Sequence, residues 1–144
     1  MKFDEMFRKA TGIDKGPFQY QRVMAKSEEF PSLLEVPTGM GKTAAAILGW
    51  LWRRRFADDG TRASTPRRLV YCLPMRVLVE QTRDCAVLWL HRLGMLGGRV
   101  MCGVKDKRET IDEYDPWNGG DDPEKIRVHL LMGGDVDRDW DVYP

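Results

Sequence analysis

A glycine-rich segment, Pro37-Thr-Gly-Met-Gly-Lys-Thr43, contains the residue types that bind the phosphates of a nucleotide. Gly39 and Gly41 can take positive φ angles, which lets backbone N–H groups point at phosphate oxygens. Lys42 offers a cation to the β- and γ-phosphates, and the Thr43 hydroxyl is placed to ligate the Mg²⁺ that bridges them. We therefore expect ATP and Mg²⁺ as cofactors, Lys42 and Thr43 as catalytic residues and Thr43 as the metal ligand. The expected cofactor-binding residues of the segment are Thr38, Gly39, Met40, Gly41, Lys42 and Thr43.

The segment departs from the general phosphate-loop pattern GxxxxGK[ST] at one position. That pattern requires a glycine where this chain has Val36. An alternative interpretation is a glycine turn that opens a helix, with Lys42 simply solvated.

A phosphate loop needs a strand before it and a helix after it. The short apolar run Leu33–Val36 predicts the strand, and the spacing of Ala44, Ile47, Leu48 and Leu51 predicts a helix that begins at the loop. Two further runs, 68–73 and 126–132, predict strands. A second helix is predicted from about Met75 to Leu93, ended by Gly94, with an apolar stripe formed by Leu78, Thr82, Cys85, Trp89 and Leu93. Alternating strands and helices predict an α/β fold with a parallel sheet flanked by helices.

The remaining segments carry weaker local signals. Ala57–Pro66 and Asp115–Pro123 are rich in turn-forming residues, and both are predicted to be loops. Thr110–Tyr114 is predicted to belong to a short helix.

Composition and charge narrow the class of protein. A chain of 144 residues with 42% hydrophobic and 31% charged residues suits one globular domain. The formal net charge of +1 gives no electrostatic argument for a nucleic-acid partner, so that argument must come from individual sites. We interpret the charged clusters as solvated faces; they are Arg53–Arg55, Arg67–Arg68 and Lys105–Arg108.

Cysteine usage and the N-terminus indicate the compartment. Cys72, Cys85 and Cys102 include no CxxC pair, which indicates neither a disulfide framework nor a zinc site. The N-terminus lacks the apolar stretch of a signal peptide, and the longest apolar run is too short to span a bilayer. These features predict a soluble cytoplasmic protein with no membrane partner.

Three segments together resemble superfamily 2 helicases, which commonly carry A-x-x-G-x-G-K-T at the phosphate loop. V-P-T-G-M-G-K-T is similar to it, with Val36 in place of the small first residue. Upstream, Pro17-Phe-Gln-Tyr-Gln21 resembles the helicase Q motif, which implies that Gln21, or Gln19 as the alternative, binds the adenine edge. Phe18 or Tyr20 could stack on the base.

The third segment, Pro74-Met-Arg-Val-Leu-Val-Glu-Gln81, is similar to helicase motif Ia, which implies that Arg76 contacts the phosphates of single-stranded DNA. The Gly133–Gly134 pair resembles a glycine pair that lets a DNA backbone approach closely, although a plain turn explains it equally well.

The combination most resembles the CRISPR-associated helicase of type I systems, especially the type I-U (I-G) branch. The resemblance implies that residues 1–144 are the N-terminal, ATP-binding portion of a RecA-like P-loop motor domain with an incomplete sheet. It implies single-stranded DNA, a CRISPR surveillance complex and the remaining domains of a longer parent chain as partners. Two alternatives are a nucleotide-binding module without turnover and a P-loop kinase of small molecules.

The resemblance also implies parts that we expect elsewhere. We expect the carboxylate motif D-E-x-[DH] beyond Pro144, with Asp135 or Asp137 as a weak substitute. A second motor domain and a metal-dependent nuclease domain are expected outside these residues, because His91 and His129 suit surface or core roles. The 144-residue chain alone is therefore expected to bind ATP without steady hydrolysis.

Overall fold

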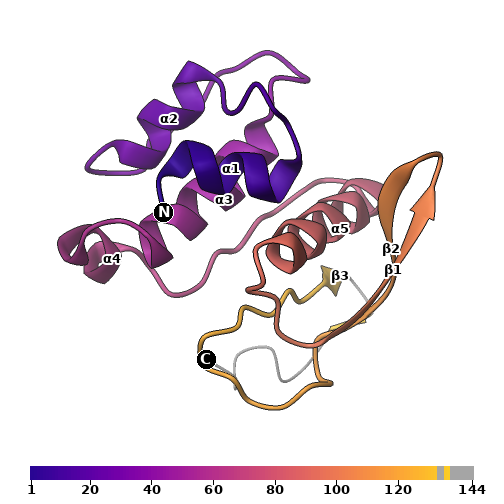
Figure 1. Ribbon diagram of the computed structural model, residues 1–144. Helices are drawn as coiled ribbons and strands as arrows, with labels where there is room; N and C mark the ends of the chain where they lie inside the picture. Colours follow the sequence, from indigo (N-terminus) through magenta and orange to yellow (C-terminus); the bar gives the residue numbers. More distant parts are fainter. Residues whose placement is uncertain (133–134, 137–144) are drawn as a thin grey trace. The chain divides into compact units, whose positions relative to one another are not determined.

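The computed structural model describes residues 1–132 and the backbone of residues 135–136, and the chain divides into two compact units. Unit 1 comprises Met1–Val70 and unit 2 comprises Tyr71–Pro144. Unit 1 is helical, with α1 (Phe3–Thr11), α2 (Gln19–Lys26), α3 (Lys42–Arg55) and α4 (Asp59–Ser64). Within it α2 packs along α3, and α1 contacts both helices (Figure 1).

The core of unit 1 forms around the apolar face of α3. The predicted stripe of Ala44, Ile47, Leu48 and Leu51 is confirmed, since all four side chains are buried. Helix α1 buries four side chains against this core, and α2 adds two; they are Phe3, Met6, Phe7, Ala10, Met24 and Ala25. Burying these apolar side chains stabilises the helix that follows the glycine loop.

Arg53 is buried in this core, so its interpretation as part of a solvated face is wrong. The side chain leaves α3 and is only 4% exposed. Its guanidinium donates to the carbonyl oxygens of Ala25 at 3.3 Å and Glu28 at 2.8 Å, and also to that of Ser27. It lies 5.3 Å from the centroid of the Phe30 ring. These carbonyls lie at and beyond the C-terminal end of α2, where the helix itself offers no N–H donors. Arg53 therefore supplies the donors.

Helix α4 forms where a loop was predicted. The Asp58 carboxylate caps it by accepting hydrogen bonds from the Thr61 backbone N–H at 3.0 Å and from the Thr61 hydroxyl at 2.7 Å. The backbone hydrogen bond, followed by that of the hydroxyl, lowers the pKa of Asp58. The prediction failed because Asp, Ser and Thr are typical of turns and also of helix N-caps.

The described residues of unit 2 form one helix and short antiparallel strands. Helix α5 (Arg76–Arg92) confirms the second predicted helix, and Gly94 ends it with φ +71°. The predicted stripe is wrong in register, because the side chains that α5 buries are Ala86, Val87 and Leu90. Cys85, which the stripe included, is exposed. The strands are β1 (Arg99–Lys105), β2 (Arg108–Asp115), β3 (Leu131–Met132) and β4 (Asp135–Val136).

A tight hairpin joins β1 to β2. The two turn residues, Asp106 and Lys107, have φ values of 51° and 61°, as a type I′ hairpin turn requires. The charged cluster at 105–108 therefore forms a strand connection. Thr110–Tyr114 lies in β2, so the helix predicted there is wrong. A bulge interrupts the pairing between Met101 and Cys102.

The predicted parallel sheet of a P-loop fold is wrong. Across residues 1–132 and 135–136 the sheets are two antiparallel pairs, β1–β2 and β3–β4, with one isolated parallel bridge between Leu96 and Ile126. The runs 33–36 and 68–73 form no strand, and of the run 126–132 only β3 is one.

The predicted strands fail to form because, among the described residues, they lack strands to pair with. A short apolar run becomes a strand only when a neighbour satisfies its backbone N–H and C=O groups. Leu33 and Val70 instead stay 74% and 66% exposed. Two antiparallel strands can pair when a turn of only two residues joins them, whereas two parallel strands need a long crossover connection. Residues 116–123 contain no helix or strand, which confirms the turn-rich connection.

No helix in the described part of the chain combines the length and the apolar character needed to cross a membrane.

Candidate phosphate-binding site

The glycine loop of unit 1 leads directly into the N-terminus of α3. Gly39 and Gly41 have φ values of +84° and +74°, which confirms the positive φ angles predicted for them. Gly41 is the N-cap of α3, and Lys42 and Thr43 are its first residues. The N–H groups of a first helical turn have no partner within the helix and lie at the positive end of its dipole. This end of α3 is therefore suited to an anion such as phosphate.

Gln21 of α2 holds the loop in place. Its Nε2 donates to the Gly41 carbonyl oxygen at 2.9 Å, and its Oε1 accepts from the Phe18 backbone N–H at 2.8 Å. The side chain is 1% exposed. A Cβ at Gly41 would lie 2.7 Å from Gln21 Nε2, so any other residue there would displace the Gln21 amide. The carboxamide positions the loop in this structure, and its contact with adenine stays a prediction.

Tyr20 makes a second contact with the loop. Its hydroxyl donates to the carbonyl oxygen of Met40, the residue before Gly41. Burial raises the pKa of Tyr20, while its hydrogen bond with Gln21 acts in the opposite direction, so the hydroxyl remains a donor at neutral pH. Its ring stacks on Phe18 with centroids 6.2 Å apart and an interplanar angle of 16°. Phe18 is 48% exposed and offers an aromatic face near the loop.

The other predicted loop residues remain accessible. Thr38, Gly39 and Lys42 are exposed, while Met40 and Thr43 are half-buried. The alternative adenine contact, Gln19, is the exposed first residue of α2. A ligand can therefore reach the loop, Lys42 and Thr43 from solvent.

The predicted nucleic-acid residues do not belong to unit 1. Arg76 is the exposed first residue of α5 in unit 2. Gly133, Gly134 and Asp137 lie outside the described residues. Asp135 begins β4, where only the backbone is described.

A carboxylate motif expected beyond Pro144 has a literal match inside the chain. Asp112-Glu-Tyr-Asp115 spells D-E-x-D, and a scan for that pattern alone finds it. The match lies in β2 of the antiparallel hairpin. Asp112 Oδ1 accepts from the Thr110 hydroxyl at 3.2 Å, and Asp115 Oδ1 accepts from the Trp117 N–H at 2.9 Å. These local bonds account for two of the carboxylates, and nothing in the hairpin assigns them to a nucleotide.

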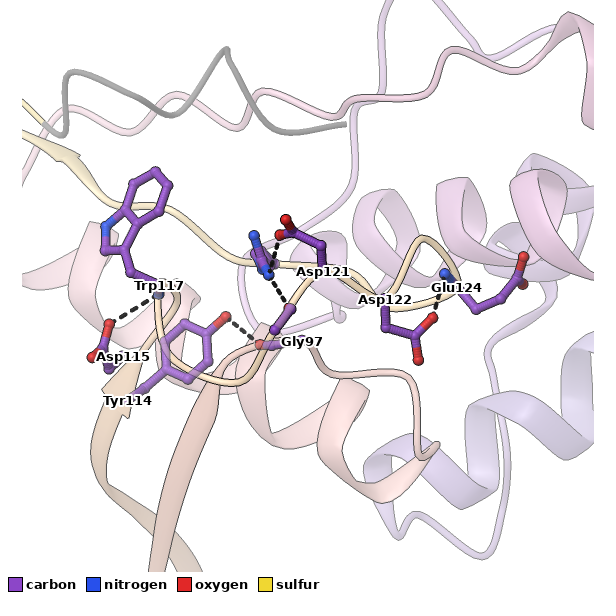
Figure 2. A network of polar contacts seen from close by, with 9 residues as sticks. Gly97, Tyr114, Asp115, Trp117, Asp121, Asp122 and Glu124 are labelled. Atoms are coloured by element: carbon purple, nitrogen blue, oxygen red, sulfur yellow. Dashed lines mark hydrogen bonds and ion pairs between the residues drawn. The ribbon is translucent and has the colours of Figure 1, made fainter.

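Asp115 and Tyr114 belong to a polar network that fastens the segment after β2 (Figure 2). The Tyr114 hydroxyl donates to the Gly97 carbonyl oxygen at 2.9 Å and accepts from the Val128 N–H at 3.1 Å. Two bonds join neighbours along the connection, from Trp117 N to Asp115 and from Glu124 N to Asp122, and Arg127 donates to Asp121 Oδ1 at 3.2 Å. We infer a structural role for this network, because its carboxylates mostly bind nearby backbone.

Replacing Tyr114 with phenylalanine is expected to destabilise unit 2 by about 1 kcal/mol at neutral pH, the usual contribution of such a hydrogen bond. Burial, the largest cause, raises the pKa of Tyr114 above its ordinary value of 10.0. Its contribution to stability is therefore complete below pH 10 and is lost as the pH rises through the higher folded-state pKa. Urea unfolding between neutral pH and pH 11 should show a shallower alkaline loss in Tyr114→Phe. Equal alkaline losses in both proteins would contradict this role.

Comparisons with protein-family models, with curated proteins and with solved structures give no match to this chain. A function is therefore inferred from the residues and geometry of the loop.

Proposed function

We propose that the chain is the ATP-binding part of an ATP-dependent DNA helicase or translocase, and that the segment 37–43 is its nucleotide site. One observation carries the proposal: two glycines with left-handed φ angles lead into the N-terminus of α3, with Lys42 and Thr43 in its first turn. Nucleotide binding at this segment depends on the loop and the helix and requires no parallel sheet. Gln21 and Tyr20 hold the loop through Gly41 and Met40, and Gly39 and Lys42 are exposed to solvent.

Each residue of the site has a role that its chemistry supports. The N–H groups in the first turn of α3 are suited to bind phosphate oxygens, and the exposed Lys42 ammonium neutralises their charge. The Thr43 hydroxyl is a hard oxygen donor of the kind that Mg²⁺ prefers, so Thr43 fits the role of metal ligand. Bound Mg²⁺ would supply further neutralisation of the phosphates. The exposed face of Phe18 is suited to stacking on a base.

The proposed role in CRISPR interference is based on the sequence resemblance. The three helicase-like segments support movement along single-stranded DNA, and Arg76 is the proposed contact with the DNA backbone. A CRISPR surveillance complex and further domains of a parent chain would be the partners. Turnover needs positioned carboxylates and a catalytic arginine, and loss of the arginine alone costs roughly 10³- to 10⁵-fold in rate. We therefore expect nucleotide binding by this chain without steady hydrolysis.

Replacing Lys42 with alanine tests the site directly. The variant is expected to lose at least about tenfold in affinity for Mg²⁺-ATP, because a hydrogen bond to a charged group contributes about 1.5–3 kcal/mol. Lys9→Ala is the matched control, since Lys9 is an exposed lysine of the same unit that lies in α1. Equilibrium titration with a fluorescent ATP analogue measures both affinities, and circular dichroism checks the fold.

Equal ATP affinities of Lys42→Ala and Lys9→Ala would refute the site. Phosphate release, with and without single-stranded DNA, measures turnover separately. DNA-stimulated release that Lys42→Ala abolishes would show that the chain supplies its own carboxylate. Asp112→Asn and Glu113→Gln would then test the D-E-x-D match.

A further inference from the structure

Three side chains that commonly bind metals converge in unit 2. They are His91 near the end of α5, Cys102 in β1 and Glu109 in β2. One ligand atom from each, an imidazole nitrogen, the thiol sulfur and a carboxylate oxygen, lies within 4.8 Å of the other two. His91 and Cys102 are exposed and Glu109 is half-buried, so an ion can reach them from solvent.

The hairpin register places Cys102 and Glu109 on the same face. Cys102 pairs with Ile111 and Val104 pairs with Glu109, and residues two apart along a strand point to the same side. The register shift between Met101 and Cys102 skips Asp112 of β2, so this same-face relation applies to the part of the hairpin from Cys102 to Ile111, on the turn side of the bulge.

Packing of α5 against β2 brings His91 to this face. Arg92, the residue after His91, donates from Nε to Glu109 Oε2 at 2.9 Å. This ion pair orients the carboxylate through Oε2. Carboxylates that bind metals are usually hydrogen-bonded by residues outside the ligand set, a role that Arg92 could fill here.

The donor set selects the ion. Thiolate sulfur is a poor ligand for Mg²⁺ and Ca²⁺, which take oxygen, whereas sulfur, imidazole and carboxylate together suit Zn²⁺. Zinc ligand distances of about 2.0–2.3 Å imply donor atoms roughly 3.3–3.8 Å apart, so the cluster must contract by about 1 Å. Exposed side chains can make that change by rotating about their side-chain bonds.

We propose that His91, Cys102 and Glu109 form a zinc site that ties the end of α5 to the β1–β2 hairpin, with water completing the coordination. Three protein ligands with an open fourth position are a common zinc arrangement. The proposal is independent of ATP binding, because its residues lie in unit 2 and the glycine loop lies in unit 1. The sequence indicated no zinc site because the ligands come from three elements and form no CxxC pair.

Cobalt binding by the full chain tests the site, because Co²⁺ substitutes for Zn²⁺ and a cobalt–thiolate bond has a charge-transfer absorption band. The band should appear at one equivalent and disappear when Zn²⁺ is added. Cys102→Ser should abolish it, and His91→Gln and Glu109→Gln should each weaken Co²⁺ binding by at least about tenfold. Cys72→Ser and Cys85→Ser are matched controls, since both residues are exposed cysteines outside the cluster, and these variants should keep the band.

Three results would each overturn the zinc site. They are the absence of the cobalt–thiolate band in the unsubstituted chain, a band that persists in Cys102→Ser, and an equal loss of the band in Cys85→Ser. Affinity unaffected by His91→Gln and Glu109→Gln would show that a lone thiol binds the ion. Circular dichroism of each variant excludes unfolding as the cause, and Lys42→Ala should leave the cobalt spectrum unchanged.

Discussion

Arg53→Ala is expected to lower the free energy of unfolding of unit 1 by about 2–4 kcal/mol. The substitution removes a buried guanidinium that donates to the carbonyls of Ala25, Ser27 and Glu28. The contact with the Ala25 carbonyl is buried, and a buried acceptor left without a partner costs about 1–3 kcal/mol. The part-buried contacts with Ser27 and Glu28 add less, because water can replace them. Loss of the contact with the Phe30 ring adds to the effect. Native-state hydrogen exchange of α2 and α3 measures the change within unit 1.

Arg54→Ala is the matched control for Arg53. Arg54 is the next residue of α3, is half-buried, and donates to the Arg62 carbonyl oxygen at 2.9 Å. Its removal should cost about 1 kcal/mol or less, as for one accessible hydrogen bond. Arg53→Lys should fall between the two, because an ammonium keeps the charge but cannot reach the carbonyls with a planar fork. Equal protection of α2 in the Arg53 and Arg54 variants would refute the capping role.

Gly41→Ala is expected to destabilise the loop and the start of α3 by about 2–5 kcal/mol. An L-residue at φ +74° costs about 1–2 kcal/mol. The new Cβ would also lie 2.7 Å from Gln21 Nε2, which is buried and donates to the Gly41 carbonyl oxygen. Displacing that amide leaves a buried group without its hydrogen-bond partner, which costs about 1–3 kcal/mol more.

Gly39→Ala separates backbone strain from packing. Gly39 has φ +84°, but no heavy atom lies within 4 Å of a Cβ built there. It should therefore lose only the backbone contribution, about 1–2 kcal/mol. Urea unfolding and Mg²⁺-ATP titration of both variants measure stability and nucleotide affinity. If Gly41→Ala is no less stable than Gly39→Ala, the Gln21 contact does not constrain the loop.

Features that depend on neighbouring residues in the chain could be predicted from the sequence. The stripe on α3 repeats at helical spacing and is buried as expected. Gly39 and Gly41 take the positive φ angles that their lack of a Cβ permits. Helix α5 and its end at Gly94 follow from the same kind of signal. These features are local, because a helix hydrogen-bonds within four residues and a φ angle belongs to one residue.

Features that need a distant partner could not be predicted in the same way. The runs at 33–36 and 68–73 are apolar, but within the described residues no neighbouring strand pairs with them. The β1–β2 hairpin was missed because its turn is Asp106-Lys107, which lacks the Asn-Gly or Asp-Gly pair typical of type I′ turns. Arg53 stands in a run of three arginines, and only the packing of α2 against α3 decides that it is the buried one.

The sequence alone determined the chemistry of the glycine loop and the helix that follows it, because Gly39, Gly41, Lys42 and Thr43 are contiguous. Only the tertiary structure decided that Gln21 and Tyr20 hold this loop from 20 residues away, and that the expected parallel sheet is absent from the described residues. It likewise decided that His91, Cys102 and Glu109 meet. Contacts between residues that are distant in sequence depend on strand register, bulges and helix packing. These features arise across the fold and produce no fixed spacing in the sequence.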